Sequence, residues 1–294
     1  LICKEDPDII IGYNIFGFDY EFMFRRSLEN NCAEKFLALS RYTNNGLNGI
    51  CGKTDATGLV LEDGIENKQL VIASGEYDLK FYDIPGRLQI DMYAYFRRDF
   101  NLSSYKLDDV AGEYISDTIK HTESIHNDDN PYTELYSGNL TGLHKNDYIH
   151  LELVTFTVDY YDDGKKFKVI DIYSKEKDGK NYNVILIEGH HVFEKNKKLK
   201  WGVAKDDVTP QDIFRLTNGD ASDRAIVAKY CIQDCNLVHH LMKKIDVITG
   251  YVEMSNICSV PISFLVFRGQ GIKLTSYVAK KCREKNTLMP DWKR

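Results

Sequence analysis

The chain has 294 residues, with 44 acidic and 38 basic side chains, so its formal net charge is −6. Hydrophobic residues make up 43% of the chain and include 19 Tyr and 14 Phe, enough to form a core, which excludes general disorder. No apolar run approaches the roughly 18 residues that a membrane span requires, and the negative charge does not favour general nucleic-acid binding, although charge acts locally.

The first third of the chain predicts an α/β unit. An apolar, β-branched run at residues 8–13 is typical of a buried strand. A turn at 14–17 follows, and apolar residues at helical spacing predict a helix over 18–30. Glycine-rich sequence at 44–64 indicates a loop or hairpin, and alternation at 88–92 predicts a second strand.

A helix and a β-rich insert are predicted next. Ser103 or Ser104 is the expected N-cap of a helix over residues 105–114. The composition then changes, because residues 116–205 open with a polar stretch and become rich in β-branched residues, which predicts a small barrel or sandwich. Its predicted strands are 148–161, 166–173 and 182–188, with hairpin turns at Asp162-Asp163-Gly164 and at 177–180.

Helical sequence resumes after the insert. Thr209 as N-cap with Pro210 at the first helical position is a strong start signal. Asp220 is expected to cap a long helix that runs to Ile248, and a last helix is expected over 270–285.

The cysteines and the basic segments indicate an environment and a partner. The seven cysteines lack a paired framework, so a reduced, intracellular protein is the better interpretation, and no second close pair completes a zinc site with Cys231 and Cys235. Residues 273–294 carry seven basic and two acidic side chains, a local charge of +5 that could face phosphates. The basic run at 195–200 is more simply explained as a solvated face.

Two groups of side chains could carry chemistry. Tyr230 and Asp234 are four residues apart on the predicted long helix, so they share one face. Asp19 begins a helix directly after a buried strand, which places a carboxylate at the C-terminal edge of the sheet, where α/β proteins build sites. In isolation, each group has a simpler explanation. Tyr230 and Asp234 can be a packed Tyr beside a solvated Asp, and Asp19 can be a carboxylate that caps its helix.

Both groups lie within longer strings that together resemble the family B DNA polymerases. Residues 6–19 resemble the second exonuclease motif of that family, and residues 230–234 resemble the third, in the tyrosine subtype of the DEDD exonucleases. Residues 86–107 contain matches to the region between the motifs, and 251–273 looks like the segment after the third. The resemblance covers nearly the whole chain except the insert and is closest to polymerases of large DNA viruses.

The resemblance implies a 3′→5′ proofreading exonuclease on a ribonuclease-H-like α/β fold, a mixed sheet flanked by helices. It implies hydrolysis of the 3′-terminal phosphodiester of frayed primer DNA with two Mg²⁺ ions, which Mn²⁺ can replace. Asp19 and Asp234 would bind the metals, and Tyr230 would orient the attacking water. The residues expected to contact DNA are Asn14, Phe18, Arg268, Gln270 and Lys273.

The resemblance also implies partners, a location and a domain order. The expected partners are primer–template DNA, a single-stranded 3′ end and the remainder of a polymerase chain, with no membrane and with a sliding clamp left open. The expected location is a viral replication site in the host cytoplasm or nucleus. We expect 1–115 and 206–250 to form the exonuclease domain around the insert at 116–205, and 251–294 to connect towards the polymerase domain.

Two family features have no match, the first exonuclease motif (Asp-x-Glu on an upstream strand) and the polymerase palm motifs. We therefore expect the sequence to be a slice through a larger polymerase, and a poor nuclease by itself because half of the metal cage is missing. A free-standing DEDD exonuclease is a weaker alternative, because residues 260–273 belong to the polymerase family's linking region. A catalytically silent nucleic-acid-binding module is a third, against which Asp19, Tyr230 and Asp234 argue. Compact family members lack the insert, which is most simply a decoration.

Overall fold

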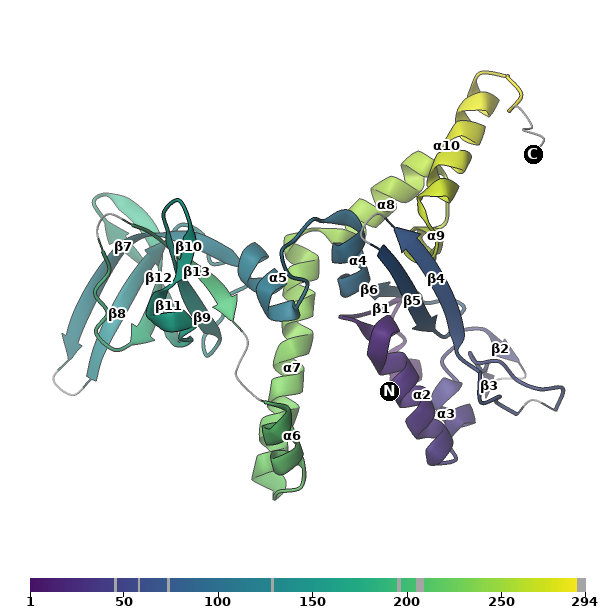
Figure 1. The fold of residues 1–294 in the computed structure, drawn as a ribbon, viewed down its shortest axis with the longest axis horizontal. Helices are drawn as coiled ribbons and strands as arrows, with labels where there is room; N and C mark the ends of the chain where they lie inside the picture. Colours follow the sequence, from purple (N-terminus) through teal and green to yellow (C-terminus); the bar gives the residue numbers. More distant parts are fainter. Residues whose placement is uncertain are drawn as a thin grey trace. The chain divides into compact units, whose positions relative to one another are not determined.

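The computed structural model describes residues 1–44, 47–57, 59–72, 75–127, 130–194, 197–204 and 209–289. The chain divides into two compact units, which are described separately. The first unit comprises Leu1–Asn101 and Asp246–Arg294, and the second comprises Leu102–Ile245. Each unit contains helices and strands, so the expected mixture of α and β structure is confirmed (Figure 1). No helix in this described part of the chain is long and apolar enough to cross a membrane.

A pair of parallel strands lies at the centre of the first unit. β1 (Ile9–Gly12) runs beside β6 (Leu88–Asp91), with Ile9 opposite Leu88 and Gly12 opposite Asp91. Both strands lie where the sequence predicts them. Because parallel strands end at the same edge, the segments that follow Gly12 and Asp91 leave the sheet from neighbouring positions.

The helix predicted after the first strand is present but begins later than expected. Residues Ile15–Asp19 form a π-helical turn, and α2 (Tyr20–Glu29) continues from it, burying Phe24. α4 (Met92–Asp99) follows β6 directly and was not predicted, because eight residues with only Met92 and Phe96 buried give too little periodicity. The short helices α1 and α3 and the helix α4 span Ile2–Glu5, Ala33–Leu37 and Met92–Asp99.

Hairpins and the C-terminal helices complete the first unit. β4 (Glu66–Ile72) pairs with β5 (Gly75–Phe81), a hairpin that the sequence pattern did not predict. Phe267 stacks on Phe81 with ring centroids 4.2 Å apart, which joins the C-terminal helices to this hairpin. The remaining elements are β2 (Thr43–Asn44), β3 (Leu47–Asn48), α8 (Val247–Cys258), α9 (Ile262–Phe267) and α10 (Gln270–Glu284), the last as predicted.

The insert folds as a closed β-barrel in the second unit (Figure 1). Seven antiparallel strands follow the order β10-β9-β11-β12-β8-β7-β13, and β13 also pairs with β9. Six strands therefore close into a ring, and β10 extends it from β9. The strands are β7 (Ser116–Asn127), β8 (Asn130–Ser137), β9 (Tyr148–Val154), β10 (Val158–Tyr160), β11 (Phe167–Lys177), β12 (Lys180–Glu188) and β13 (Lys198–Ala204).

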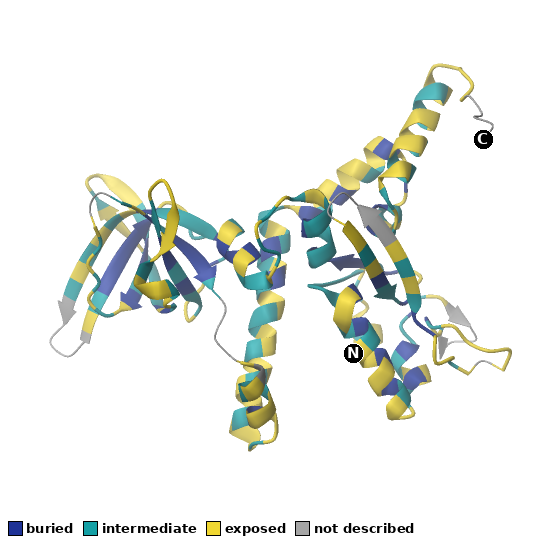
Figure 2. Cartoon of the chain, in the orientation of Figure 1, coloured by how far each residue is buried: buried dark blue, intermediate teal, exposed yellow. Residues whose placement is uncertain are grey.

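The barrel has a dense interior, drawn dark blue in Figure 2. Trp201 of β13 is 1% exposed, and its indole N–H donates to the Ser137 hydroxyl at 3.0 Å. Of the two predicted hairpin turns, 177–180 is confirmed because Lys177 pairs with Lys180. The turn at 162–164 is no hairpin, because β10 and β11 each pair with β9 rather than with each other.

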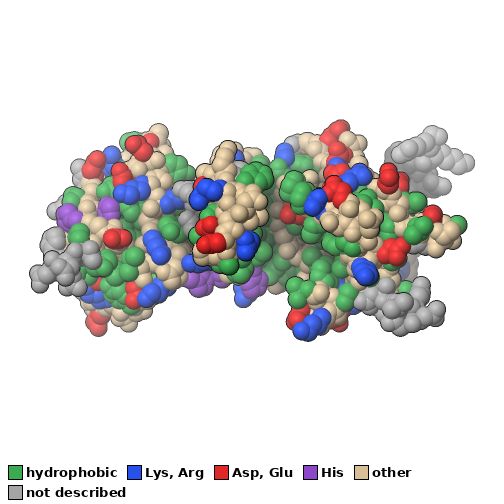
Figure 3. All heavy atoms as spheres, turned by 90° about the horizontal axis from the view of Figure 1, so that it is seen from below, with side chains coloured by type: hydrophobic (Ala, Val, Ile, Leu, Met, Phe, Trp, Pro, Cys, Tyr) green, Lys and Arg blue, Asp and Glu red, His purple; other side chains and the backbone are tan. Residues whose placement is uncertain are grey.

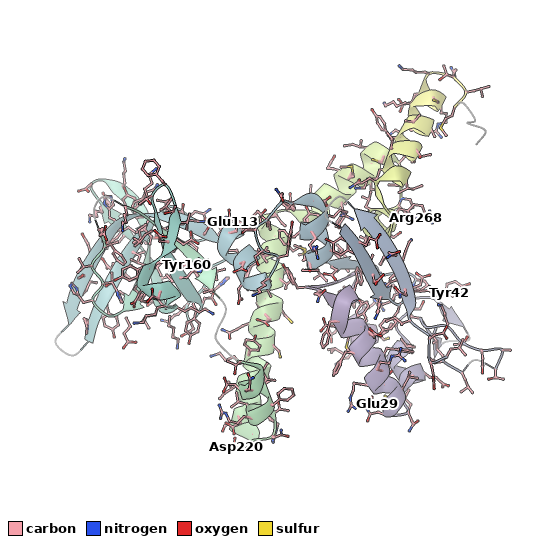
Figure 4. The ribbon with its side chains drawn as sticks, in the orientation of Figure 1. Glu29, Tyr42, Glu113, Tyr160, Asp220 and Arg268 are labelled. Carbon is pink, nitrogen blue, oxygen red and sulfur yellow. The ribbon has the colours of Figure 1, made fainter. Side chains whose placement is uncertain are left out.

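Three helices accompany the barrel in the second unit. α6 (Pro210–Thr217) and α7 (Ala221–Lys244) begin at the predicted N-caps Thr209 and Asp220, and each start is a complete capping box. Asp220 is labelled in Figure 4. α7 ends at Lys244, earlier than the predicted Ile248.

The start of α5 (Leu107–Tyr114) differs from the expected one. Its N-cap position is Lys106 rather than Ser103 or Ser104. The Ser104 hydroxyl donates to the Asp109 carboxylate in the first turn instead, which explains why a serine close to the helix start does not itself cap it.

Candidate active site

The buried carboxylate of Asp91 organises the edge where β1 and β6 end. It accepts three backbone N–H bonds, from Asn14 at 2.7 Å, Phe16 at 3.0 Å and Tyr93 at 2.9 Å. Burial raises the pKa of Asp91 to about 6, although these N–H groups favour its charged form. Asp91 therefore fixes the path of the chain that leaves β1.

That path leads to the segment that resembles a second exonuclease motif. Asn14 has a φ of 61°, a left-handed conformation that Asn tolerates better than most residues. It precedes the π-helical turn of Ile15–Asp19, a local form that is often found at functional sites. Asn14, Phe18 and Asp19 therefore follow one short, irregular segment that Asp91 holds in place.

Asp19 lies at the end of this turn, in the N-cap position of α2. Its side chain makes no capping hydrogen bond to α2. Helix capping, the simplest alternative role for this carboxylate, is therefore not what the structure shows. The residue is partly buried, and burial raises its pKa. A partly desolvated carboxylate that caps no helix is suited to binding a cation.

Phe18 presents an aromatic face to solvent. Its side chain is 58% exposed and stacks on Phe22, which is 52% exposed, with ring centroids 5.5 Å apart and an interplanar angle of 14°. Exposed stacked rings offer a flat apolar surface on which a base of any identity can stack. Phe16, two residues earlier, is buried in the core.

Tyr230 and Asp234 lie on α7 in the second unit. Both are partly buried, and both line a cavity of about 540 Å³, named here the α7 cavity. The structure thus brings these two predicted residues together, whereas Asn14, Phe18 and Asp19 belong to the first unit. The α7 cavity is lined by Gly142, His144, Lys145, Asn146, Asp147, Tyr148, Val203, Ala204, Lys229, Tyr230, Gln233, Asp234, Asn236, Leu237 and His240.

The wall of the α7 cavity facing α7 comes from the barrel, chiefly from the loop before β9. In that loop Asp147 accepts the backbone N–H of His144 at 2.7 Å, and burial raises the pKa of Asp147. The His144 and His240 rings lie 4.5 Å apart, which joins the loop to α7. Burial, together with the neighbouring His144, lowers the pKa of His240, which favours its neutral form.

The predicted DNA-binding residues near the C-terminus lie around the start of α10. Arg268 is exposed, and its guanidinium carbon lies 4.0 Å from the centre of the Phe264 ring (Figure 4). Gln270, the first residue of α10, is exposed too. Lys273 is only partly exposed, and its burial lowers its pKa. Arg268 and Gln270 are therefore the more accessible of the three.

Charge on the surface is mixed in sign. Figure 3 shows basic and acidic side chains interspersed over the visible face rather than gathered into one basic field. The mixed charge on this face agrees with the net charge of −6. The expectation that a negative chain could still bind DNA locally stays a prediction.

The sequence missed two features of this site. Asp91 was seen only as part of a family match, although its position at the end of a strand beside β1 follows the same edge argument that singled out Asp19. The loop at 142–148 carries no motif, and its place beside Tyr230 is a long-range contact between segments about ninety positions apart in the sequence. No local pattern could have predicted it.

Comparison with known proteins finds a matching family model and similar proteins. Residues 1–110 match the family described as DNA polymerase family B, exonuclease domain. The chain is 46% identical over 291 residues to the DNA polymerase of Phaeocystis pouchetii virus, covering 99% of this chain and 26% of that protein. The match therefore includes the insert, which the motifs alone did not cover.

Two further relatives agree. The DNA polymerase of Pyramimonas orientalis virus is 37% identical over 292 residues, which are 99% of this chain and 20% of that protein. The DNA polymerase delta catalytic subunit of Arabidopsis thaliana is 26% identical over 294 residues, covering 100% of this chain and 17% of that protein. The chain spans about a quarter of the length of these relatives or less.

Proposed function

We propose that this chain, which carries the exonuclease domain of family B DNA polymerases, is part of a viral replicative DNA polymerase and removes the 3′-terminal nucleotide of frayed primer DNA. One observation carries the proposal. Tyr230 and Asp234, which match the family's third exonuclease motif, line the same cavity on α7. A phenol and a carboxylate one helical turn apart suit the positioning of a water for phosphodiester hydrolysis.

The core around β1 and β6 is proposed to be ribonuclease-H-like. Support comes from the parallel pairing of these strands and from Asp19, which follows the edge where both strands end. The boundaries of the exonuclease domain (1–115 and 206–250), the insert (116–205) and the connection (251–294) stay predictions.

Asp19 and Asp234 are the proposed metal ligands. Their carboxylate oxygens are the hard donors that Mg²⁺ prefers. These two residues are therefore of the right chemical type for a metal site, but they are too few to form one by themselves. Among the residues that the structure describes, no group of three or more His, Cys, Asp or Glu side chains could hold a metal ion. Asp91 adds no ligand, because three backbone N–H groups occupy its oxygens. Two bound ions would stabilise charge on the attacking and leaving oxygens.

The other predicted residues would position the DNA. Phe18 would stack against a base of the frayed end, and Asn14 would supply a polar contact from the same segment. Arg268, Gln270 and Lys273 would contact the strand at the start of α10. The partners are then primer–template DNA, its single-stranded 3′ end and the rest of the polymerase, whereas a sliding clamp and a replication site in the host cytoplasm or nucleus stay predictions.

The proposal is tested in the complete polymerase with a 5′-labelled single strand and Mg²⁺. Asp234→Ala should reduce 3′→5′ degradation by at least about 100-fold, because the variant loses a proposed metal ligand, while extension of a matched primer is retained. Tyr230→Phe keeps the ring but removes the hydroxyl, so it should lower kcat with little change in KM. Degradation that persists in Asp234→Ala would exclude this site as the nuclease.

A further inference from the structure

We infer that the α7 cavity binds one unpaired nucleotide of the strand being cut and that the barrel supplies one of its walls. The inference rests on the proposed function and deepens it, because it gives the insert a direct contact with the substrate. The α7 cavity and both of its walls lie within the second unit.

Two segments far apart in the sequence form the walls. One wall is the face of α7 between Lys229 and His240, which includes Tyr230 and Asp234. The other is the loop 142–148, together with the end of β13. A barrel that served only as a decoration could attach anywhere on the domain. Here its loop lines the same cavity as the two residues that match the exonuclease motif.

The size and lining of the α7 cavity suit a nucleotide. Its volume of about 540 Å³ lies within the range of small-molecule sites, roughly 300–1,000 Å³. Amide groups can form hydrogen bonds with base edges, rings can stack on a base, and lysines can pair with a phosphate. The lining provides all three kinds of group: the amides of Asn146, Gln233 and Asn236, the rings of His144, Tyr148 and His240, and the amines of Lys145 and Lys229.

The barrel wall is rigid before any ligand arrives. Asn146 has a φ of 72°, and its backbone N–H donates to the Val169 carbonyl at 2.9 Å. The Val169 N–H in turn donates to the Asp147 carbonyl at 2.8 Å, so the loop is tied to β11 from both sides. A preformed wall loses little conformational entropy when a ligand binds.

Lys145 is the side chain of this wall best placed for a phosphate. Its amine lies 3.2 Å from an Asp171 oxygen, with side-chain exposures of 58% and 48%. An ion pair this exposed contributes little free energy, so Lys145 can exchange Asp171 for a phosphate at small cost.

The test uses the complete polymerase and compares three variants. Lys145→Glu reverses a charge in the α7 cavity, and His240→Ala removes a ring from its α7 wall. Lys180→Glu makes the same charge reversal at the exposed β11–β12 hairpin, outside the α7 cavity, and is the matched control. The readouts are KM and kcat for degradation of a single strand, and binding of the same strand by fluorescence anisotropy in EDTA.

We expect Lys145→Glu to raise KM and weaken metal-free binding by about fivefold or more, with kcat within about twofold of the parent. His240→Ala should weaken binding less, and Lys180→Glu should match the parent. Extension of a matched primer should be the same in all three. If Lys145→Glu and His240→Ala behave like Lys180→Glu while Asp234→Ala loses degradation, the inference is wrong and the proposed function stands. If Asp234→Ala retains degradation, the proposed function fails, and the inference fails with it.

Discussion

Replacing Asp91 with Ala should release the segment that carries Asn14, Phe18 and Asp19. The carboxylate accepts three backbone N–H bonds of 2.7, 3.0 and 2.9 Å, and alanine leaves all three donors without that acceptor. Each orphaned donor costs about 1–3 kcal/mol when it stays buried. Because the loosened segment can partly reach water, we expect a total loss of about 3–5 kcal/mol, at the upper end for a single substitution.

Hydrogen–deuterium exchange of the complete polymerase measures this loss directly. Peptides that cover residues 13–20 should lose protection in Asp91→Ala, and peptides from the barrel should not. Exonuclease kcat should fall by at least about tenfold, because a displaced Asp19 no longer meets the reacting phosphate. Asp83→Ala removes an exposed carboxylate of the same unit and serves as the control. Equal protection and equal kcat in the two variants would refute the role assigned to Asp91.

Three further predictions follow from individual side chains. Burial raises the pKa of Asp91 to about 6 from 3.8, so the native state binds the proton more tightly. The stability of residues 13–20 relative to Asp91→Asn should therefore fall as the pH rises from about 4 to about 6, by on the order of 3 kcal/mol, and level off above. Hydrogen–deuterium exchange of this segment, corrected for the intrinsic exchange rate at each pH, measures the difference in stability between the parent and Asp91→Asn. A difference that rises over this pH window would contradict the assignment. Phe18→Ala should weaken single-strand binding by about 1–3 kcal/mol in an anisotropy titration, and Phe18→Trp should retain it. Glu134→Ala removes the acceptor of the Tyr173 hydroxyl and the buried partner of Lys175, whereas the Tyr136 hydroxyl keeps Glu123 as an acceptor. Thermal unfolding should therefore show a loss of about 1–3 kcal/mol, whereas the exposed Glu176→Ala should show almost none.

Local chemistry determined which parts of the fold could be predicted. The caps on Thr209 and Asp220 need only neighbouring residues, and both were predicted correctly. The hairpin at Lys177–Lys180 has a left-handed Asp178 and Gly179 at its centre, a pair that favours such turns. The turn at 162–164 also contains Asp-Gly but joins strands that do not pair with each other, because strand order is a property of the whole barrel.

The candidate site shows the same division. Asp19, Tyr230 and Asp234 were singled out by spacing and by family motifs, and the structure describes the environment of each. The role of Asp91 requires knowledge that β1 and β6 are parallel neighbours, since only then does its carboxylate meet the N–H groups of Asn14 and Phe16. The contribution of the loop 142–148 depends on a long-range contact between the His144 and His240 rings, which no local sequence pattern encodes.

Closure through β13 also places the start and the finish of the insert beside each other. Ser116 at the start of β7 pairs with Gly202 near the end of β13, and the Val203 N–H donates to the Ile115 carbonyl at 2.9 Å. A module with adjacent ends can be gained or lost in one genetic event without moving the host chain on either side. Such an event would also add or remove a wall of the α7 cavity, so one insertion is enough to change the lining of that cavity.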